Sequence, residues 1–284
     1  MIDYDYDYDY SKLNYVCIIM KDNIKDNIRI LTINLCDEFP GKKTILLNKW
    51  IFILSKIKGD ILFLQEVNSY NVEKLANSLE LKILNINNLE GTGVLVNPKK
   101  FTIIDNNSVK LLHSRKQPIY IGNLHLSDIP SVLHHMNHMI YKSSKTIPIN
   151  SSKDKILKLC AKNRLPVLKQ ELVKARPYVR AIIAGDFNEP SHLDLDKINV
   201  PVSKLFEKNG FVDTFWYANP HVNKEYGYTW PAGLLYKKEP GQRIDMIYTK
   251  KMRVIDSIVY DGPKLGKGKW ISDHKMVITD VEIS

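Results

Sequence analysis

Polar side chains follow four short apolar segments of this 284-residue chain, each at the point where the segment ends. In open α/β sheets, ligands bind beyond the strand ends, where the strand behind a polar group holds it rigidly. One such coincidence carries little information, but four with the same pattern indicate one shared site. The polar residues are Asn34 after 28–33, Gln65 and Glu66 after 61–64, His125 after 119–124, and Asp186 and Asn188 after 181–184.

Carboxylates and amides dominate this predicted site, and they favour a hard metal ion. Oxygen ligands select Mg²⁺ or Mn²⁺, ions that keep several waters and bridge to phosphate oxygens. A metal held in this way polarises a phosphoryl group and stabilises the leaving oxygen. The oxygen donors in question are Glu66, Asp186, Asp245 and Asp273, with the amides of Asn34 and Asn188.

Two histidines add proton-transfer chemistry to these oxygens. His125 and His274 can donate to a pentacoordinate phosphorus centre or shuttle protons, and Asp245 can orient one of them. No serine or cysteine stands in a recognisable nucleophile elbow or phosphate-cradling loop. Direct attack of water on a phosphate ester is therefore the simplest scheme for this chain.

The elements that must position these residues are short strands alternating with helices. Apolar residues at helical spacing predict a helix over 45–57, with Gly59 as its stop. Helices are also expected over 131–141 and 152–176, the second broken by Pro166.

The expected strands are short and rich in Ile and Leu, as in buried sheets. Two of the segments, 93–96 and 101–104, are separated by Asn-Pro and predict a hairpin. Such mixing of strands, helices and a hairpin predicts an α/β protein with mixed sheets. The other strands are expected at 28–33, 61–64, 119–124, 179–184, 243–248, 254–260 and 275–283.

The composition is that of a soluble globule with a basic body. Hydrophobic residues make up 44% of the chain and charged residues 25%. The net charge is +10, and removing the four aspartates of the opening Asp-Tyr repeat gives +14. A basic body suits nucleic acid or anionic lipid, although scattered lysines also arise from biased codon usage. No segment approaches the roughly 18 apolar residues of a transmembrane helix.

The chain divides into two predicted parts. Residues 1–27, with the Asp-Tyr repeat, form a low-complexity segment that we expect to be flexible. Residues 28–284 have one composition and no linker, which predicts a single catalytic domain. Three widely spaced cysteines form no disulfide framework and predict an intracellular protein, in the cytoplasm or nucleus.

Five short motifs occur in a fixed order over roughly 28–283, and together they resemble the endonuclease/exonuclease/phosphatase superfamily. Its members include deoxyribonuclease I-like nucleases and exonuclease III-like repair enzymes, which are metal-dependent phosphoesterases. The resemblance implies a four-layer α/β sandwich of two mixed β-sheets flanked by helices. The motifs are LQE at 64–66, NLHL at 123–126, GDFN at 185–188, RID at 243–245 and SDH at 272–274.

The resemblance also implies the metal ligands. Glu66 would be the main ligand of Mg²⁺ or Mn²⁺, helped by Asn34 and Asp273, and Asn34 would also face the substrate. The repair enzymes carry a further acidic residue two positions after the first Asn. Cys36 stands there in this chain, with Asp37 beside it, so an additional acidic ligand is not matched.

The catalytic roles follow from the same resemblance. Asp186 would orient or deprotonate the attacking water, and Asn188 would hold a phosphate oxygen. His274 would contact the scissile phosphate with Asp245 as its partner, which leaves the Asp245–His274 pair as an alternative base. His125 would stabilise the transition state or the leaving group.

Two further features of the sequence each have two interpretations. His134 and His138 stand one helical turn apart, as zinc ligands do, but His135 occupies the place of a protease glutamate and no third ligand follows. A solvated helix face is the better interpretation. Trp230, beside the motif segments, is expected to contact substrate by stacking on a base, or else to pack a loop against the core.

The sequence therefore predicts a metal-dependent phosphoesterase whose partner is a phosphate-ester substrate. Nucleic acid is the favoured substrate, because the body is basic and aromatic residues lie beside the motifs. Two alternatives stay open: a lipid or small-metabolite phosphodiesterase or phosphatase of the same superfamily, and a catalytically silent binding scaffold. No protein partner can be inferred.

Overall fold

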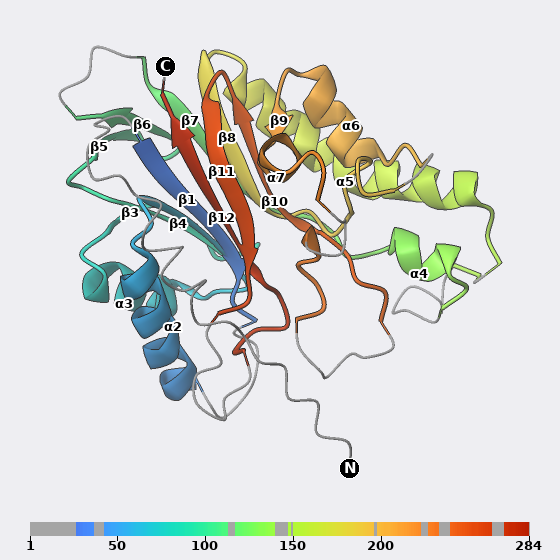
Figure 1. The fold of residues 1–284 in the computed structure, drawn as a ribbon, viewed down its shortest axis with the longest axis horizontal. Helices are drawn as coiled ribbons and strands as arrows, with labels where there is room; N and C mark the ends of the chain where they lie inside the picture. The colour runs from blue at the N-terminus through green and yellow to red at the C-terminus, as the bar shows by residue number, and fades with distance from the viewer. Residues whose placement is uncertain are drawn as a thin grey trace.

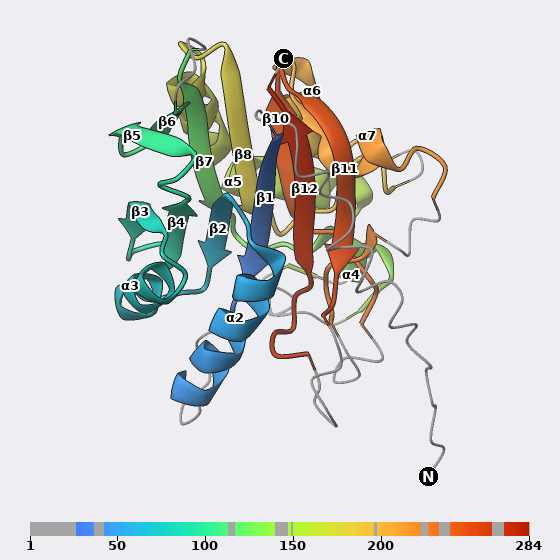
Figure 2. The ribbon, with the colours of Figure 1, turned by 60° about the vertical axis from the view of Figure 1, so that its left-hand side comes forward.

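The computed structural model describes residues 27–36, 43–112, 117–139, 147–148, 150–195, 198–222, 227–232, 239–262 and 270–283. Within these residues, two six-stranded mixed sheets lie face to face with helices on both outer sides (Figures 1 and 2). The predicted flexible segment at 1–27 lies outside the described residues, apart from Asn27, which is the first residue of a strand.

The first sheet, here called sheet A, has a parallel pair at its centre. β1 and β2 run parallel, and each also has an antiparallel neighbour, β12 beside β1 and β4 beside β2. Nearly every residue of β1 and β2 is buried, as expected for strands covered on both faces. In spatial order the strands are β11 (Arg253–Tyr260), β12 (Met276–Glu282), β1 (Asn27–Asn34), β2 (Ile61–Gln65), β4 (Thr92–Val96) and β3 (Lys82–Asn87).

The second sheet, sheet B, repeats this plan. β7 and β8 form its central parallel pair, with β6 antiparallel to β7 and β10 antiparallel to β8. The carboxyl ends of both parallel pairs are where the sequence places its polar residues. In spatial order the strands are β5 (Phe101–Asp105), β6 (Ser108–Leu111), β7 (Ile119–His125), β8 (Arg180–Asp186), β10 (Asp245–Lys250) and β9 (Val212–Asp213).

Helices cover the outer face of each sheet. Trp50 and Leu54 of α2 pack on Leu31 and Leu62 of sheet A. On the other side, α5 and α6 pack on the outer face of sheet B (Figure 1). No helix in the described part of the chain is both long and apolar enough to cross a membrane. The helices are α2 (Lys43–Ile57), α3 (Ser69–Ser78), α4 (Val132–Met136), α5 (Lys153–Ala175), α6 (Pro201–Lys208) and α7 (Thr214–Ala218).

A continuous apolar core fills the space between the two sheets. Ile30 and Phe63 from sheet A meet Ile121 and Ile182 from sheet B in one cluster of buried side chains. Burying a side chain of this size contributes about 1.5–3 kcal/mol, so the core is a major part of the fold's stability. The architecture is an α/β sandwich of two mixed sheets flanked by helices, as predicted.

The predicted hairpin of 93–96 with 101–104 is wrong. β4 pairs with β2 and β3 in sheet A, whereas β5 pairs with β6 in sheet B. The chain crosses between the sheets at Asn97, whose side chain donates to Asp60 Oδ1 at 3.0 Å. Both segments are short and apolar, and that pattern does not identify which sheet a strand joins.

The predicted break at Pro166 is also wrong, because α5 continues through it from Lys153 to Ala175. A proline removes one helical hydrogen bond and normally kinks or ends a helix. Pro166 lies on the exposed face of α5, where water can hydrogen-bond to the backbone carbonyl that the proline leaves free.

Candidate active site

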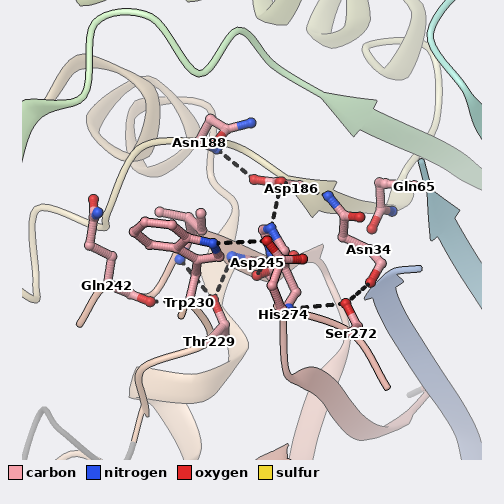
Figure 3. A network of polar contacts seen from close by, with 12 residues as sticks. Asn34, Gln65, Asp186, Asn188, Thr229, Trp230, Gln242, Asp245, Ser272 and His274 are labelled. Atoms are coloured by element: carbon pink, nitrogen blue, oxygen red, sulfur yellow. Dashed lines mark hydrogen bonds and ion pairs between the residues drawn. The ribbon is translucent and has the colours of Figure 1, made fainter. Parts of the chain in front are cut away.

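The carboxyl ends of the two central parallel pairs bring the predicted residues together. In sheet A, Asn34 lies opposite Gln65, directly before Glu66. In sheet B, His125 lies opposite Asp186. Because the sheets are stacked, these ends form one polar cluster, in which Figure 3 shows Asn34 and Gln65 of sheet A near Asp186 of sheet B.

Asn34 joins the two sheets at this cluster. Its side-chain Nδ2 donates to Glu66 Oε1 at 2.9 Å and to Asp186 Oδ2 at 3.1 Å. Its Oδ1 accepts from the Cys36 N–H at 3.0 Å. Asn34 and Asp186 are buried, whereas the side chain of Glu66 is 27% exposed and so is open to a ligand.

His125 stands over the same two carboxylates. Its Nε2 lies 3.8 Å from Glu66 Oε1 and 3.8 Å from Asp186 Oδ2. Those separations exceed a hydrogen bond, and the imidazole is partly exposed. His125 is therefore free to donate to a bound ligand.

Asp245 and His274 form a buried pair next to Asp186. Asp245 Oδ2 lies 2.9 Å from His274 Nδ1, and His274 Nε2 lies 3.8 Å from Asp186 Oδ2. Asp245 begins β10, which is antiparallel to β8, so it stands directly opposite Asp186. The pair leaves Nε2 as the ring nitrogen that faces the cluster.

The electrostatics of this group favour a protonated His274. Burial disfavours its imidazolium, but Asp245 and Asp186 outweigh burial and raise the pKa of His274 to about 10. Burial also raises the pKa of the Asp186 carboxyl, and the charge of Asp245 raises it further. A carboxylate with a raised pKa is a better general base near neutral pH than an ordinary one.

Left-handed backbone marks two of the site residues. Glu66 has φ 48° and Asn188 has φ 49°, a conformation uncommon for residues other than glycine and often found at functional sites. Asn188 is held by its own N–H, which donates to Asp186 Oδ1 at 2.9 Å, and by Nδ2, which donates to Leu126 O at 2.9 Å.

A shell of residues behind the cluster received no role from the sequence. Thr229 Oγ1 accepts from the backbone N–H groups of Ile244 at 3.0 Å and Asp245 at 3.1 Å. Ser272 Oγ donates to Asn34 O at 2.7 Å and accepts from the His274 N–H at 3.0 Å (Figure 3). Ser272 stands inside the SDH motif, which was the only signal that could have identified it.

Trp230 lies at the edge of the site beside Asp273. Its Nε1 donates to Asp273 Oδ2 at 3.3 Å, and its backbone is bridged to Gln242. The indole ring is partly exposed, so it can pack against the loop and still present a surface to a substrate. Its role as a substrate contact stays a prediction.

The donor set fits a divalent metal ion. Asp273 Oδ1 and Asp245 Oδ1 are buried and have no hydrogen-bond partner, and an unpaired buried carboxylate oxygen is costly unless a cation balances it. Asp186, Asp245 and His274 each place a ligand atom within 4.8 Å of the others, so they form a group that could hold a metal.

The alternative set of Glu66, Asp273 and Asn34 lies in the same cluster. Burial, and then the charges of Asp273 and Glu66, raise the pKa of the Cys36 thiol, so both carboxylates lie near Cys36. The amide oxygen of Asn34 faces the Cys36 N–H, so Asn34 orients Glu66 in this arrangement. Its role as a direct ligand stays a prediction.

The three histidines at 134–138 do not form a solvated helix face, so that interpretation is wrong. His134 and His135 are buried, and His138 lies beyond the end of α4. Ser131 Oγ lies 2.6 Å from His134 Nδ1, and Glu239 contacts His134 Nε2 closely. Both ring nitrogens of His134 are thus engaged, which also argues against a zinc ligand.

A model of the Endonuclease/Exonuclease/phosphatase family matches residues 52–274. That range contains every residue of the cluster except Asn34. An uncharacterised protein of Caenorhabditis elegans is 33% identical over 141 residues, which cover 41% of this chain and 45% of the relative. The match therefore spans less than half of that curated protein.

Solved structures share the fold at low sequence identity. A conserved protein of unknown function from Enterococcus faecalis has a TM-score of 0.60 at 17% identity, covering 90% of this chain and 100% of that one. A humanised D. rerio TDP2 has a TM-score of 0.60 at 15% identity, covering 90% and 99%. D. rerio TDP2 complexed with a single-strand DNA product has a TM-score of 0.57 at 14% identity, covering 90% and 99%.

Proposed function

Because this chain belongs to the endonuclease/exonuclease/phosphatase family, we propose that it hydrolyses a phosphodiester by in-line attack of an activated water. The observation that carries the proposal is the convergence of Glu66, His125 and Asp186 from the ends of three strands in two sheets. Polar residues placed at strand ends by chance would not lie in contact with one another and with the buried Asp245–His274 pair.

Asp186 orients and deprotonates the attacking water. Its Oδ1 is fixed by the Asn188 N–H, and its Oδ2 faces both His125 and His274. The raised pKa of Asp186 makes it a better proton acceptor near neutral pH. Asn188 holds a non-bridging phosphate oxygen.

His274 donates from Nε2 to a second phosphate oxygen. Asp245 holds the other ring nitrogen, fixes the orientation of the ring and keeps the imidazole protonated. His125 donates to the leaving oxygen, since its Nε2 faces the cluster and has no hydrogen bond to either carboxylate. The protonated His274 and the N–H of His125 stabilise the negative charge that develops on the phosphorane.

Glu66 and Asp273, with Asn34 orienting Glu66, would hold Mg²⁺ or Mn²⁺. The ion would polarise the phosphoryl oxygen and stabilise the leaving oxygen. The unpaired Asp273 Oδ1 and the partly exposed Glu66 support this assignment. We prefer it to the group of Asp186, Asp245 and His274, because a protonated His274 has no lone pair to offer a metal.

Nucleic acid is the favoured substrate of this site. The net charge of +14 without the four repeat aspartates supports a polyanion. Trp230 offers an aromatic surface beside Asp273, and stacking on a base is worth about 1–3 kcal/mol. The fold shared with D. rerio TDP2 complexed with a single-strand DNA product is consistent with this choice.

The test is cleavage of a supercoiled plasmid and of a labelled single-stranded oligonucleotide in Mg²⁺ or Mn²⁺. The control is the Asp186→Asn protein, which keeps the shape of the site. Cleavage that EDTA and Asp186→Asn both abolish supports the proposal. Turnover of sphingomyelin vesicles or an inositol phosphate, without cleavage of nucleic acid, would mean that the substrate is a lipid or a small metabolite. No turnover of any of these would leave a binding scaffold.

A further inference from the structure

A fully buried ion pair lies directly behind the strand-end loops of sheet B. Arg164 of α5 donates from Nη1 to Glu189 Oε2 at 3.1 Å, and both side chains are 0% exposed. The guanidinium also donates to Ser127 O at 2.8 Å and to Pro130 O at 2.7 Å. Glu189 Oε1 accepts from the Val202 N–H at 2.7 Å, so both carboxylate oxygens are used.

This pair connects the two loops that carry the chemistry. Ser127 lies two residues after His125, and Glu189 directly follows Asn188. The loops touch once more in front of the pair, where Asn188 Nδ2 donates to Leu126 O at 2.9 Å. Arg164 therefore fixes the separation between the leaving-group histidine and the residue that holds a phosphate oxygen.

Stability alone gives little reason to keep such a pair. Replacing a buried ion pair by apolar residues of similar volume is often neutral or stabilising, because burying two charges is expensive. The left-handed backbone at Asn188, with φ 49°, supplies another reason. A conformation of this kind persists only where surrounding contacts determine it. Glu189 directly follows Asn188, so the contacts that hold the Glu189 carboxylate also restrain the backbone of Asn188.

We infer that Arg164 and Glu189 are positioning residues of the active site, a role that rests on the proposed phosphodiester hydrolysis. They touch neither substrate nor metal. Arg164 acts on the loop after His125, and Glu189 acts on Asn188. Because the geometry of transition-state contacts is demanding, a displacement of about 1 Å can cost 100-fold in rate.

The test compares two double variants, each of which removes one buried polar contact of α5. Arg164→Met with Glu189→Gln removes both charges while keeping an acceptor for the Val202 N–H. The control is Tyr120→Phe with Glu171→Gln, which removes the buried 2.7 Å hydrogen bond between β7 and α5. Hydrolysis of bis(p-nitrophenyl) phosphate is measured in Mn²⁺, with thermal melting of each protein.

The inference expects the Arg164/Glu189 variant to lose about 10- to 100-fold in kcat, while the control keeps the wild-type kcat at a comparable melting temperature. Hydrogen–deuterium exchange should quicken at 126–130 and 187–190 in the first variant only. A folded Arg164/Glu189 variant with wild-type kcat would overturn the inference. If that variant does not fold, Arg164→Lys is measured instead, since lysine keeps the charge and lacks the guanidinium group that contacts several oxygens. A wild-type kcat in Arg164→Lys would also overturn the inference.

The two proposals fail in different ways. If the wild-type protein itself turns over no phosphodiester, both the proposed function and the catalytic part of this inference are wrong. If the wild type is active and the folded Arg164/Glu189 variant keeps its kcat, only the positioning inference is wrong.

Discussion

Gly185 directly precedes Asp186 at the end of β8 and pairs with Leu124 of β7, and alanine should not be tolerated there. Its φ is +143°, and a Cβ at this position would lie 1.9 Å from the backbone oxygen of Leu124. No side-chain rotation relieves a contact with backbone, so the two strands must separate next to His125 and Asp186. Gly185 exists because the pairing of β7 with β8 leaves no room for a side chain.

The loss of stability expected for Gly185→Ala has two parts. Forcing alanine into a glycine-only backbone region costs about 1–3 kcal/mol, and breaking one or two strand hydrogen bonds costs roughly 1 kcal/mol each. Gly185→Ala should therefore lose about 2–5 kcal/mol in the free energy of unfolding, of the 5–15 kcal/mol typical of a domain. At about 2–4 °C per kcal/mol for a chain of this size, the melting temperature should fall by about 4–20 °C.

Gly210→Ala separates the two parts. Gly210 also has positive φ, +77°, but nothing lies within 4 Å of a Cβ built there. It should lose only the backbone part, about 1–2 kcal/mol, and keep its kcat. Urea unfolding and hydrolysis of a chromogenic phosphodiester measure both effects. Equal losses of stability in the two variants, or wild-type kcat in Gly185→Ala, would refute the reasoning from strand contact.

Three further predictions follow from single residues. Glu66→Gln should weaken Mn²⁺ binding by at least about 10-fold in calorimetry with an unchanged melting curve, and unchanged affinity would remove Glu66 from the ligand set. His134→Gln should cost about 1–3 kcal/mol in urea unfolding, because it disturbs a buried contact with Glu239; no loss would contradict that contact. Burial raises the pKa of Asp256, so its ionised form lowers stability at pH 7 and the penalty vanishes below its ordinary pKa. Asp256→Asn, which keeps the acceptor for the Ser257 N–H, should raise the melting temperature at pH 7 and not at pH 3, and equal effects at both would refute the sign.

The strand-end residues could be predicted because their strands are central and parallel. A central parallel strand is buried on both faces and appears in sequence as a short continuous apolar segment, which makes its end visible. Asn34, Glu66, His125 and Asp186 all stand at or directly after such ends. The sheet then brings them together without further information.

The Asp245–His274 pair could be predicted only from the resemblance. Asp245 begins its strand, and it reaches the site because β10 is antiparallel to β8. His274 precedes β12 in a segment without an apolar pattern. Strand direction within a sheet depends on distant pairing, so local sequence does not reveal that these two residues meet.

Partners far apart along the chain explain what the sequence did not reveal. A histidine on a short helix reads as solvated until Glu239, 105 positions from His134, is known to contact it. Thr229 likewise holds the backbone of Asp245 across 16 positions. Composition and periodicity describe a residue's own segment, whereas burial of a polar group depends on whether a partner arrives.

The site is an interface between the two sheets, and its geometry depends on how they pack. Asn34 of sheet A contacts Asp186 of sheet B, and His274, before β12, contacts Asp245 of sheet B. Apolar contacts alone leave the sliding of one sheet over another weakly specified, since the hydrophobic effect is non-directional. Asn123 of β7 supplies direction, because its Nδ2 donates to the backbone oxygens of β2 and β4 at 3.0 Å and its Oδ1 accepts from Gln65 at 2.7 Å. Since Gln65 directly precedes Glu66, these hydrogen bonds set where the Glu66 carboxylate lies relative to His125 and Asp186 of sheet B.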